Sequence, residues 1–483
     1  MMKKFIYILP LMAGMLFATA CEDDYRDPSG IVNDYMDEYK EMLASSEYGW
    51  RFDYYPDTTQ YGAFNLWMQF AENGRVKMQV DKNLFYLFAS EEDLAKGYDW
   101  QESDYTIQNS QGPVLTFATY SLLHKLSDPT FDEHNFGSGW AGDFEFVLMG
   151  HSEAGDTIYL KSVRAQKSCY IVKNTVDPNE DIKKLNKVID EFTGGDDVNV
   201  YFRDMIFSGQ EDSVAVLAGF DMISRSGVIY QMKEDKMVAD TCAVYFSTKG
   251  VHLSKPIQVN GVEVKEFIYD EEQNDFLING QTGHTIKMAE NGLPKFQFPV
   301  RKEVFRGMYE YISGRDTIMR EDNYQLAYNP KSAEDEWKVL YESLENYAMM
   351  AMFADDASGS QYIFAIYDQY QDKSGRTVPC LAQCPLNYYW DTETGRDDMV
   401  AFIGAATSSL VYASQNENYV YQQGTDLSKE YQARIEKPLK SYLTALFGSA
   451  FTPVKCIIVP SPDYESFSFV NVADGTSLVI NKY

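Results

Sequence analysis

The chain has 483 residues, with 42 Lys or Arg against 72 Asp or Glu, and its formal net charge at pH 7 is −30. This acidity argues against a nucleic-acid partner, because phosphate recognition needs clustered Lys and Arg. It also disfavours electrostatic binding to an anionic membrane surface. The chain contains 36 Tyr and 29 Phe, which favours strands and well-filled cores.

The first twenty residues have the three-part pattern of a secretory signal peptide. Lys3 and Lys4 precede an uncharged run of 13 residues, and the small residues Ala18, Thr19 and Ala20 follow it. The apolar run is too short to cross a hydrocarbon layer of about 30 Å as a helix, so a retained transmembrane helix is the weaker alternative. Cleavage after residue 20 removes two lysines and no acids, which changes the net charge from −30 to −32.

Cys21 follows the small residues at the position of the lipidated cysteine in a bacterial lipobox. Acyl chains each bury many CH₂ groups at about 0.8 kcal/mol apiece, so a multiply acylated cysteine anchors stably in a lipid bilayer. We therefore interpret Cys21 as a lipidation site rather than as a disulfide cysteine. Residues 21–30 are polar and turn-rich, which predicts a short flexible tether.

Residues 31–195 are predicted to form a first domain, in which an N-terminal helix is followed by a β-rich region. Apolar residues at helical spacing predict a helix from Ile31. Asn73-Gly74 then separates two strand-like runs, and Asn-Gly is a strong hairpin signal because a type I′ turn needs positive φ at both positions. A second helix, after Asp177, closes this domain at Gly194-Gly195.

Residues 196–300 are predicted to form a second β-rich domain, with Asn260-Gly261 as another hairpin turn. The segments 115–129 and 244–256 share a weak similarity, and we leave open whether the two domains arose by duplication. Residues 301–483 are predicted to form a C-terminal α+β domain with helices at 332–347 and 429–448. The fold class is therefore α+β and β-rich, with two mostly antiparallel barrel- or sandwich-like domains, flanking helices and a mixed C-terminal region.

Five cysteines besides Cys21 are too few and too dispersed for a disulfide scaffold. Cys380 and Cys384 lie between Pro379 and Pro385 and could pair in a bent loop. Isolated buried thiols are an equal alternative, and the sequence does not decide between them.

The sequence lacks the common motifs of metal, phosphate and nucleophile sites, so we expect neither a metal nor a cofactor. The densest polar segment, 127–146, holds Asp128, Asp132, Glu133, His134 and Asp143. Such a cluster can bind a cation or perform acid–base chemistry, but in an acidic chain it more often forms a solvated turn. The sequence does not reveal the paired carboxylates of a glycosidase, because the fold, and not their separation along the chain, sets the distance between them.

Aromatic side chains are the candidates for ligand binding, because their faces can stack on a sugar ring. Trp140 and the consecutive Tyr388, Tyr389 and Trp390 are the selected residues. The alternative is that these rings are packed in β-sheet cores.

These motifs together make the chain similar to a Bacteroidetes-type surface lipoprotein, and specifically to the domain of unknown function 4302 family. The residues that carry the resemblance are 49–57, 61–76, 111–120, 127–129, 139–146, 158–162 and 256–267. Ala141-Gly142 stands where the family pattern has Gly-Gly. The resemblance implies association with a SusC/SusD-type outer-membrane uptake system and gives no catalytic residues. It also implies that Glu22, Asp23 and Asp24 are an export signal to the cell exterior.

The leading hypothesis is a non-catalytic, surface-exposed outer-membrane lipoprotein that binds a glycan or peptide nutrient for such a system. A hydrolase with carboxylates that converge in space is the first alternative. A structural scaffold that docks the transporter is the second.

Overall fold

The computed structural model of the protein describes residues 28–57, 61–89, 94–95, 97–110, 112–130, 139–195, 200–209, 213–300, 326–327, 334–344, 347–355, 361–405, 410–414, 421–449, 451–464, 466–475 and 477–481. The predicted signal peptide and Cys21 lie outside these residues. The chain divides into two compact units. The first ends at Lys183, and the second runs from Lys184 to the C-terminus and also includes Gly62.

The first unit contains a closed antiparallel barrel of eight strands, in which each strand pairs with its neighbour in sequence. β1 and β8 close it through the pairs Trp50↔Lys173 and Arg51↔Val172. Buried and exposed side chains alternate along β1, β4 and β7, because one face of each strand points into the barrel. The strands are β1 (Trp50–Tyr54), β2 (Phe64–Phe70), β3 (Arg75–Val80), β4 (Gln101–Asn109), β5 (Pro113–Phe117), β6 (Glu145–His151), β7 (Thr157–Ser162) and β8 (Ser168–Lys173).

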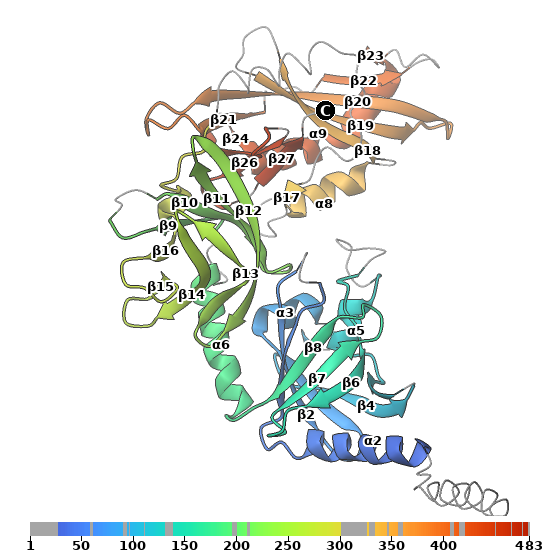
Figure 1. Ribbon diagram of the computed structural model, residues 1–483. Helices are drawn as coiled ribbons and strands as arrows, with labels where there is room; N and C mark the ends of the chain where they lie inside the picture. Colours follow the sequence, from blue (N-terminus) through green and yellow to red (C-terminus); the bar gives the residue numbers. More distant parts are fainter. Residues whose placement is uncertain are drawn as a thin grey trace, which may run out of the picture. The chain divides into compact units, whose positions relative to one another are not determined.

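Among the described residues, the helices that lie or begin in this unit are α2 (Pro28–Ala44), α3 (Lys82–Phe88), α5 (Leu122–Ser127) and α6 (Pro178–Thr193), which continues into the second unit. Figure 1 shows α2 lying across one end of the barrel, where it contacts β2, β4 and β5. α3 follows β3 directly because the Asp81 carboxylate accepts a hydrogen bond from the Leu84 amide and caps the first turn. α6 has the predicted apolar stripe, and its last residues belong to the second unit.

The second unit begins with another closed eight-stranded antiparallel barrel, again with strands paired in chain order. Phe192 of α6 packs on the rings of Phe220, Phe246, Phe267 and Phe276 in this barrel. The strands are β9 (Phe202–Ile206), β10 (Ala215–Asp221), β11 (Ser226–Lys233), β12 (Lys236–Ser247), β13 (Gly250–Val259), β14 (Val262–Asp270), β15 (Asp275–Ile278) and β16 (Thr285–Met288), and a 3₁₀ turn, η2 (Glu290–Gly292), follows.

Both Asn-Gly pairs lie in hairpins, as predicted, but only one forms the expected turn. At Asn260-Gly261 both residues have positive φ, 48° and 77°, and Val259 pairs directly with Val262. At Asn73-Gly74 only Gly74, at 82°, has positive φ, and the loop is closed by a hydrogen bond from the Ala71 amide to the Arg75 carbonyl. The first turn is therefore longer than a two-residue type I′ turn.

The described residues in the rest of the second unit form an eleven-stranded sheet with the helices α8 and α9. The long β20 pairs with β19 along its length and with β22 and β21 on its other edge. The buried face of α9, which includes Tyr431, Ile435 and Leu439, packs on this sheet. The helices are α8 (Glu334–Ser343) and α9 (Asp426–Phe447). The strands are β17 (Leu326–Ala327), β18 (Tyr347–Asp355), β19 (Gln361–Gln371), β20 (Thr377–Trp390), β21 (Met399–Ala405), β22 (Leu410–Ser414), β23 (Tyr421–Gln423), β24 (Gly448–Ser449), β25 (Thr452–Pro460), β26 (Ser466–Asn471) and β27 (Ser477–Asn481).

The architecture confirms the predicted fold class, an α+β, β-rich chain with two antiparallel barrels and a mixed C-terminal region. The weak similarity between 115–129 and 244–256 does not match equivalent elements. The first segment covers β5 and α5, whereas the second covers the hairpin of β12 and β13.

Candidate functional site

Trp140, the first predicted ligand-binding residue, is packed inside the first unit. Its side chain is only 3% exposed, and it meets the ring of Phe64 edge-to-face at 6.4 Å. The Trp140 amide donates to the Leu126 carbonyl at 3.0 Å, which holds the residue against α5. A ligand cannot stack on this ring without a rearrangement of the core.

The other three predicted residues are consecutive on β20, so the alternation of the strand points them to different sides. Tyr388 is 8% exposed and packs on Phe402 at 6.2 Å in the sheet core. Trp390 is half-buried against the same core. Tyr389 is 44% exposed, and among these three rings it offers the most open surface.

Three charged side chains lie on the same sheet as Tyr389 or directly after its strand: Lys455 on β25, and Asp391 and Glu393 in the segment that follows β20. Tyr389 pairs with Ala401, and Ala401 pairs in turn with Lys455, so the three residues form one row across β20, β21 and β25. The Lys455 ammonium lies 3.2 Å from Glu393 and 3.5 Å from Asp391. An exposed ring in the same row of a sheet as a lysine that pairs with two carboxylates can offer both stacking and hydrogen bonds, which a sugar ring requires.

Contacts between these side chains shift the pKa values of Lys455 and Asp391. The Glu393 carboxylate and then Asp391 raise the pKa of Lys455, despite some burial. Burial opposes ionisation of Asp391, but the Thr394 hydroxyl and amide and the Lys455 ammonium outweigh it and lower the pKa of the carboxyl. Lys455 and Asp391 therefore stay charged at neutral pH.

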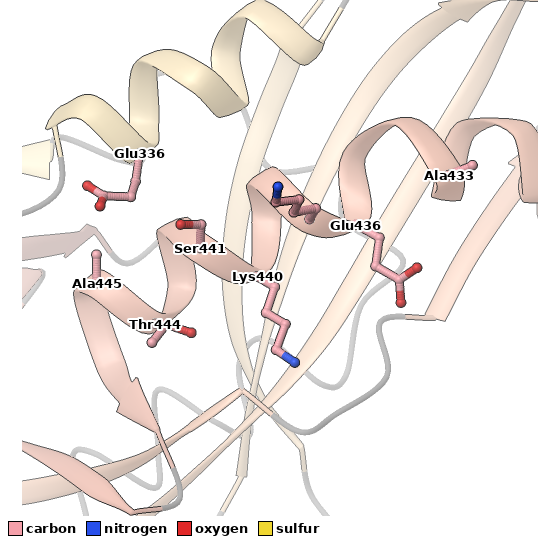
Figure 2. A pocket seen from close by; sticks show the side chains of 8 residues that line it. Glu336, Ala433, Glu436, Lys440, Ser441, Thr444 and Ala445 are labelled. Atoms are coloured by element: carbon pink, nitrogen blue, oxygen red, sulfur yellow. The ribbon is translucent and has the colours of Figure 1, made fainter.

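A separate polar hollow of about 730 Å³ lies over the solvent side of α9. Figure 2 shows that Glu336 of α8 lines one side and that the remaining residues all come from α9. They include Glu436, Lys437 and Lys440. The hollow is open and carries charges of both signs, and none of the four predicted aromatic residues lines it.

The acidic segment 127–146 is only partly described, because Asp132, Glu133 and His134 lie outside the described residues. Asp128 accepts hydrogen bonds from the amide and hydroxyl of Thr130, each at 2.8 Å. Asp143 is buried and accepts from the Arg164 amide at 2.6 Å. Both carboxylates therefore stabilise loops, which is the structural alternative for this cluster.

Cys380 and Cys384 are free thiols on β20 rather than members of a bent loop. Four residues of strand separate their Cα atoms by about 13 Å, and a disulfide needs them within about 7 Å. Both side chains point into the core against α9.

We expect both thiols to resist iodoacetamide in the folded protein and to react fully in guanidinium. Burial raises the pKa of Cys380 and of Cys384 to about 12, and only the thiolate is an effective nucleophile. Peptide mass spectrometry after native and denatured alkylation measures this directly. A crosslinked peptide that joins Cys380 to Cys384 would contradict the arrangement.

Two searches of the described residues gave negative results. No group of three or more His, Cys, Asp and Glu side chains in this part of the chain could hold a metal ion. Among the helices that the structure describes, none is long and apolar enough to cross a membrane.

The sequence of the first unit and of most of the second barrel matches a known protein family. Residues 26–271 match the family described as "Domain of unknown function (DUF4302)". Because the match covers more than half of the 483 residues, the chain belongs to this family, and the predicted resemblance to the domain of unknown function 4302 family is confirmed.

Curated proteins and solved structures were also compared with the chain. No curated protein matches the chain. Among solved structures, P47 of Clostridium botulinum E1 aligns at 9% identity over 94% of this chain and 96% of that one, with a TM-score of 0.13. This similarity is too low to support a structural argument.

Proposed function

We propose that the protein is a surface-exposed outer-membrane lipoprotein that binds a glycan or peptide nutrient as an accessory of a SusC/SusD-type uptake system. The observation that carries the proposal is the sequence around Cys21. Three small residues precede this cysteine after an apolar run, and Glu22, Asp23 and Asp24 follow it directly. This is the order of a processing site, an anchor and an address signal.

Two further observations support the proposal, the first for the tether and the second for ligand binding. The family match and the acidic body are consistent with a hydrated protein held off the bilayer by a tether. In addition, Tyr389 offers an exposed ring in the same row of the sheet as Lys455, which pairs with Asp391 and Glu393. Of the sequence-predicted aromatic residues, Tyr389 is therefore the one we retain for ligand binding, because Trp390 packs against the sheet core.

Cys21→Ser is expected to abolish acylation of the protein in a Gram-negative host that processes lipoproteins. Cells fed an alkyne fatty acid, followed by immunoprecipitation and fluorophore coupling, measure the acylation. Cys169→Ser is the matched control and should retain full labelling, because Cys169 lies on β8 and plays no part in the anchor. Equal labelling of wild type and Cys21→Ser would contradict the anchor assignment.

Replacement of Glu22, Asp23 and Asp24 by alanine is expected to keep the acylation and to lose the surface location. Proteinase K added to intact cells should digest the wild type but spare this variant. If intact cells protect the wild type from the protease, the surface assignment is wrong.

A further inference from the structure

Three side chains on the outer surface of the second barrel form a hydrogen-bonded series. The Ser247 hydroxyl lies 2.7 Å from Nε2 of His252, and Nδ1 of the same ring lies 3.0 Å from Oε2 of Glu266. The His252 side chain is 15% exposed and Glu266 is 36% exposed. The three groups are therefore partly withdrawn from water but reachable from it.

The order of the partners determines what the imidazole can do. A carboxylate only accepts hydrogen bonds, so the neutral ring carries its proton on Nδ1, toward Glu266. Nε2 is then an acceptor and faces the Ser247 hydroxyl. A hydroxyl, an imidazole and a carboxylate in this order constitute the arrangement that activates a serine nucleophile on several unrelated folds.

The sheet holds these groups in place by its register. His252 pairs with Tyr245 on β12 and with Glu266 on β14. Tyr245, His252 and Glu266 therefore form one row across three strands. The Tyr245 ring stacks on the imidazole at 4.6 Å and 15°, which restricts its rotation. Ser247 is the last residue of β12, before the turn that leads to Gly250.

The turn between Ser247 and Gly250 holds the Ser247 hydroxyl next to His252. The Lys249 amide donates to Ser247 Oγ at 3.1 Å. The hydroxyl proton has two acceptors, Nε2 of His252 at 2.7 Å and the more distant Gly250 carbonyl at 3.5 Å. Gly250 has φ of 154°, and a Cβ there would lie 2.1 Å from the Phe267 carbonyl oxygen, so only glycine lets the turn approach β14 this closely. The Thr248 amide follows the serine and donates no hydrogen bond to other described residues.

Other described histidines do not reproduce this arrangement. His124 contacts Ser121 at 3.0 Å through Nδ1, and its ring stacks on Phe144. His151 approaches Glu38 at 3.4 Å, and its Nδ1 faces the Ser152 carbonyl. Within the described residues, His252 alone is shown between a serine hydroxyl and a carboxylate.

We propose that Ser247, His252 and Glu266 form a catalytic triad that hydrolyses carboxylic esters. The three groups lie on the outer surface of a barrel, so the substrate is an acyl ester that projects from a larger molecule. Ser247 is the nucleophile, His252 the general base and acid, and Glu266 the residue that orients and stabilises the imidazolium. The Thr248 amide is the donor to the developing oxyanion.

The reaction takes two steps. Ser247 Oγ attacks the ester carbonyl while Nε2 takes the hydroxyl proton; the C–O bond to the alcohol breaks, and the imidazolium returns that proton to the leaving oxygen. A water molecule then attacks the acyl-serine, gives a proton to Nε2, and releases the carboxylic acid as Ser247 recovers the proton. The sum is ester plus water to acid plus alcohol, without a cofactor. This activity goes beyond the binding role proposed above and does not depend on it.

The test uses the purified full-length protein and a fluorophosphonate probe, which forms a stable adduct with an activated serine. Mass spectrometry should find the adduct on Ser247, and Ser247→Ala should lose it. His252→Gln should slow the labelling and the hydrolysis of p-nitrophenyl acetate about 100-fold, and Glu266→Gln should slow both by a smaller factor. Glu263→Gln, also on β14, is the matched control and should react like the wild type.

A second variant separates reactivity from folding. In Ser247→Cys the new thiol should be alkylated by iodoacetamide at pH 7 about 10-fold faster than in Ser247→Cys combined with His252→Gln, because a base beside a thiol promotes the thiolate. Circular dichroism confirms that each variant is folded. No adduct on Ser247 in folded wild type, or equal alkylation rates in the two cysteine variants, would overturn the proposal.

Discussion

Asp398→Ala is expected to lower the free energy of unfolding of the second unit by about 3–5 kcal/mol, because it leaves a buried guanidinium without its counter-ion. Asp398 is 0% exposed and Arg396 is 9% exposed. The guanidinium contacts both carboxylate oxygens, at 2.8 and 2.7 Å.

The pair also fixes the segment that leads from the second barrel to the sheet. Asp398 accepts the Phe298 amide at 2.8 Å, and Arg396 donates to the carbonyls of Pro294 and Phe296. On the barrel side, Asp204 accepts the Lys295 amide at 2.9 Å. Asp398→Ala therefore removes a backbone anchor together with a charge.

Hydrogen exchange measured by mass spectrometry on peptides around 294–298 should show faster exchange in Asp398→Ala, and the thermal transition of the second unit should fall. Asp397→Ala is the matched control, since the neighbouring side chain is exposed and surface substitutions usually change stability by less than about 0.5 kcal/mol. Equal stability of the two variants would show that the pair does not hold this segment.

Trp50→Ala is expected to destabilise the first unit by about 3–5 kcal/mol, the usual cost of truncating a large buried ring. Trp50 is 0% exposed and lies where β1 and β8 close the barrel. Its indole N–H donates to the Leu43 carbonyl at 3.0 Å, at the end of α2. The substitution therefore leaves a cavity at the seam and releases the helix.

Trp50→Phe separates these two effects, because it keeps most of the ring and removes the hydrogen bond. It should cost about 1–2 kcal/mol, close to the value of one hydrogen bond with a small change in volume. Guanidinium unfolding followed by far-ultraviolet circular dichroism gives both numbers. If the two variants lose the same stability, the cavity is not the main cost.

The sequence predicts the architecture well where one local signal decides the structure. Asn260-Gly261 forms the predicted type I′ hairpin because the flanking strands need only two linking residues. Asn73-Gly74 carries the same signal, but the ladder ends earlier, at Phe70↔Val76, so tertiary packing lengthens the loop. α3 was not predicted, because its seven residues are too few to show a helical period.

The sites are predicted less well, because burial is decided by the whole fold. Trp140 and Tyr389 are both aromatic residues near glycine- or acid-rich turns, yet one is 3% and the other 44% exposed. Packing against Phe64 and α5 buries the first, whereas the second lies on the face of β20 opposite Tyr388.

Ser247, His252 and Glu266 illustrate the same difficulty for chemistry. They are separated by up to nineteen positions in the chain, and no motif spacing joins them. Only the register of β12, β13 and β14 makes them neighbours.

The central claim, an accessory role in nutrient uptake, is tested most directly by purification of the acylated full-length protein from detergent-solubilised outer membranes of its native host. We expect SusC/SusD-type transporter subunits to be recovered with the wild type and to be depleted with Cys21→Ser. Recovery of the wild-type lipoprotein without any transporter subunit would contradict the account.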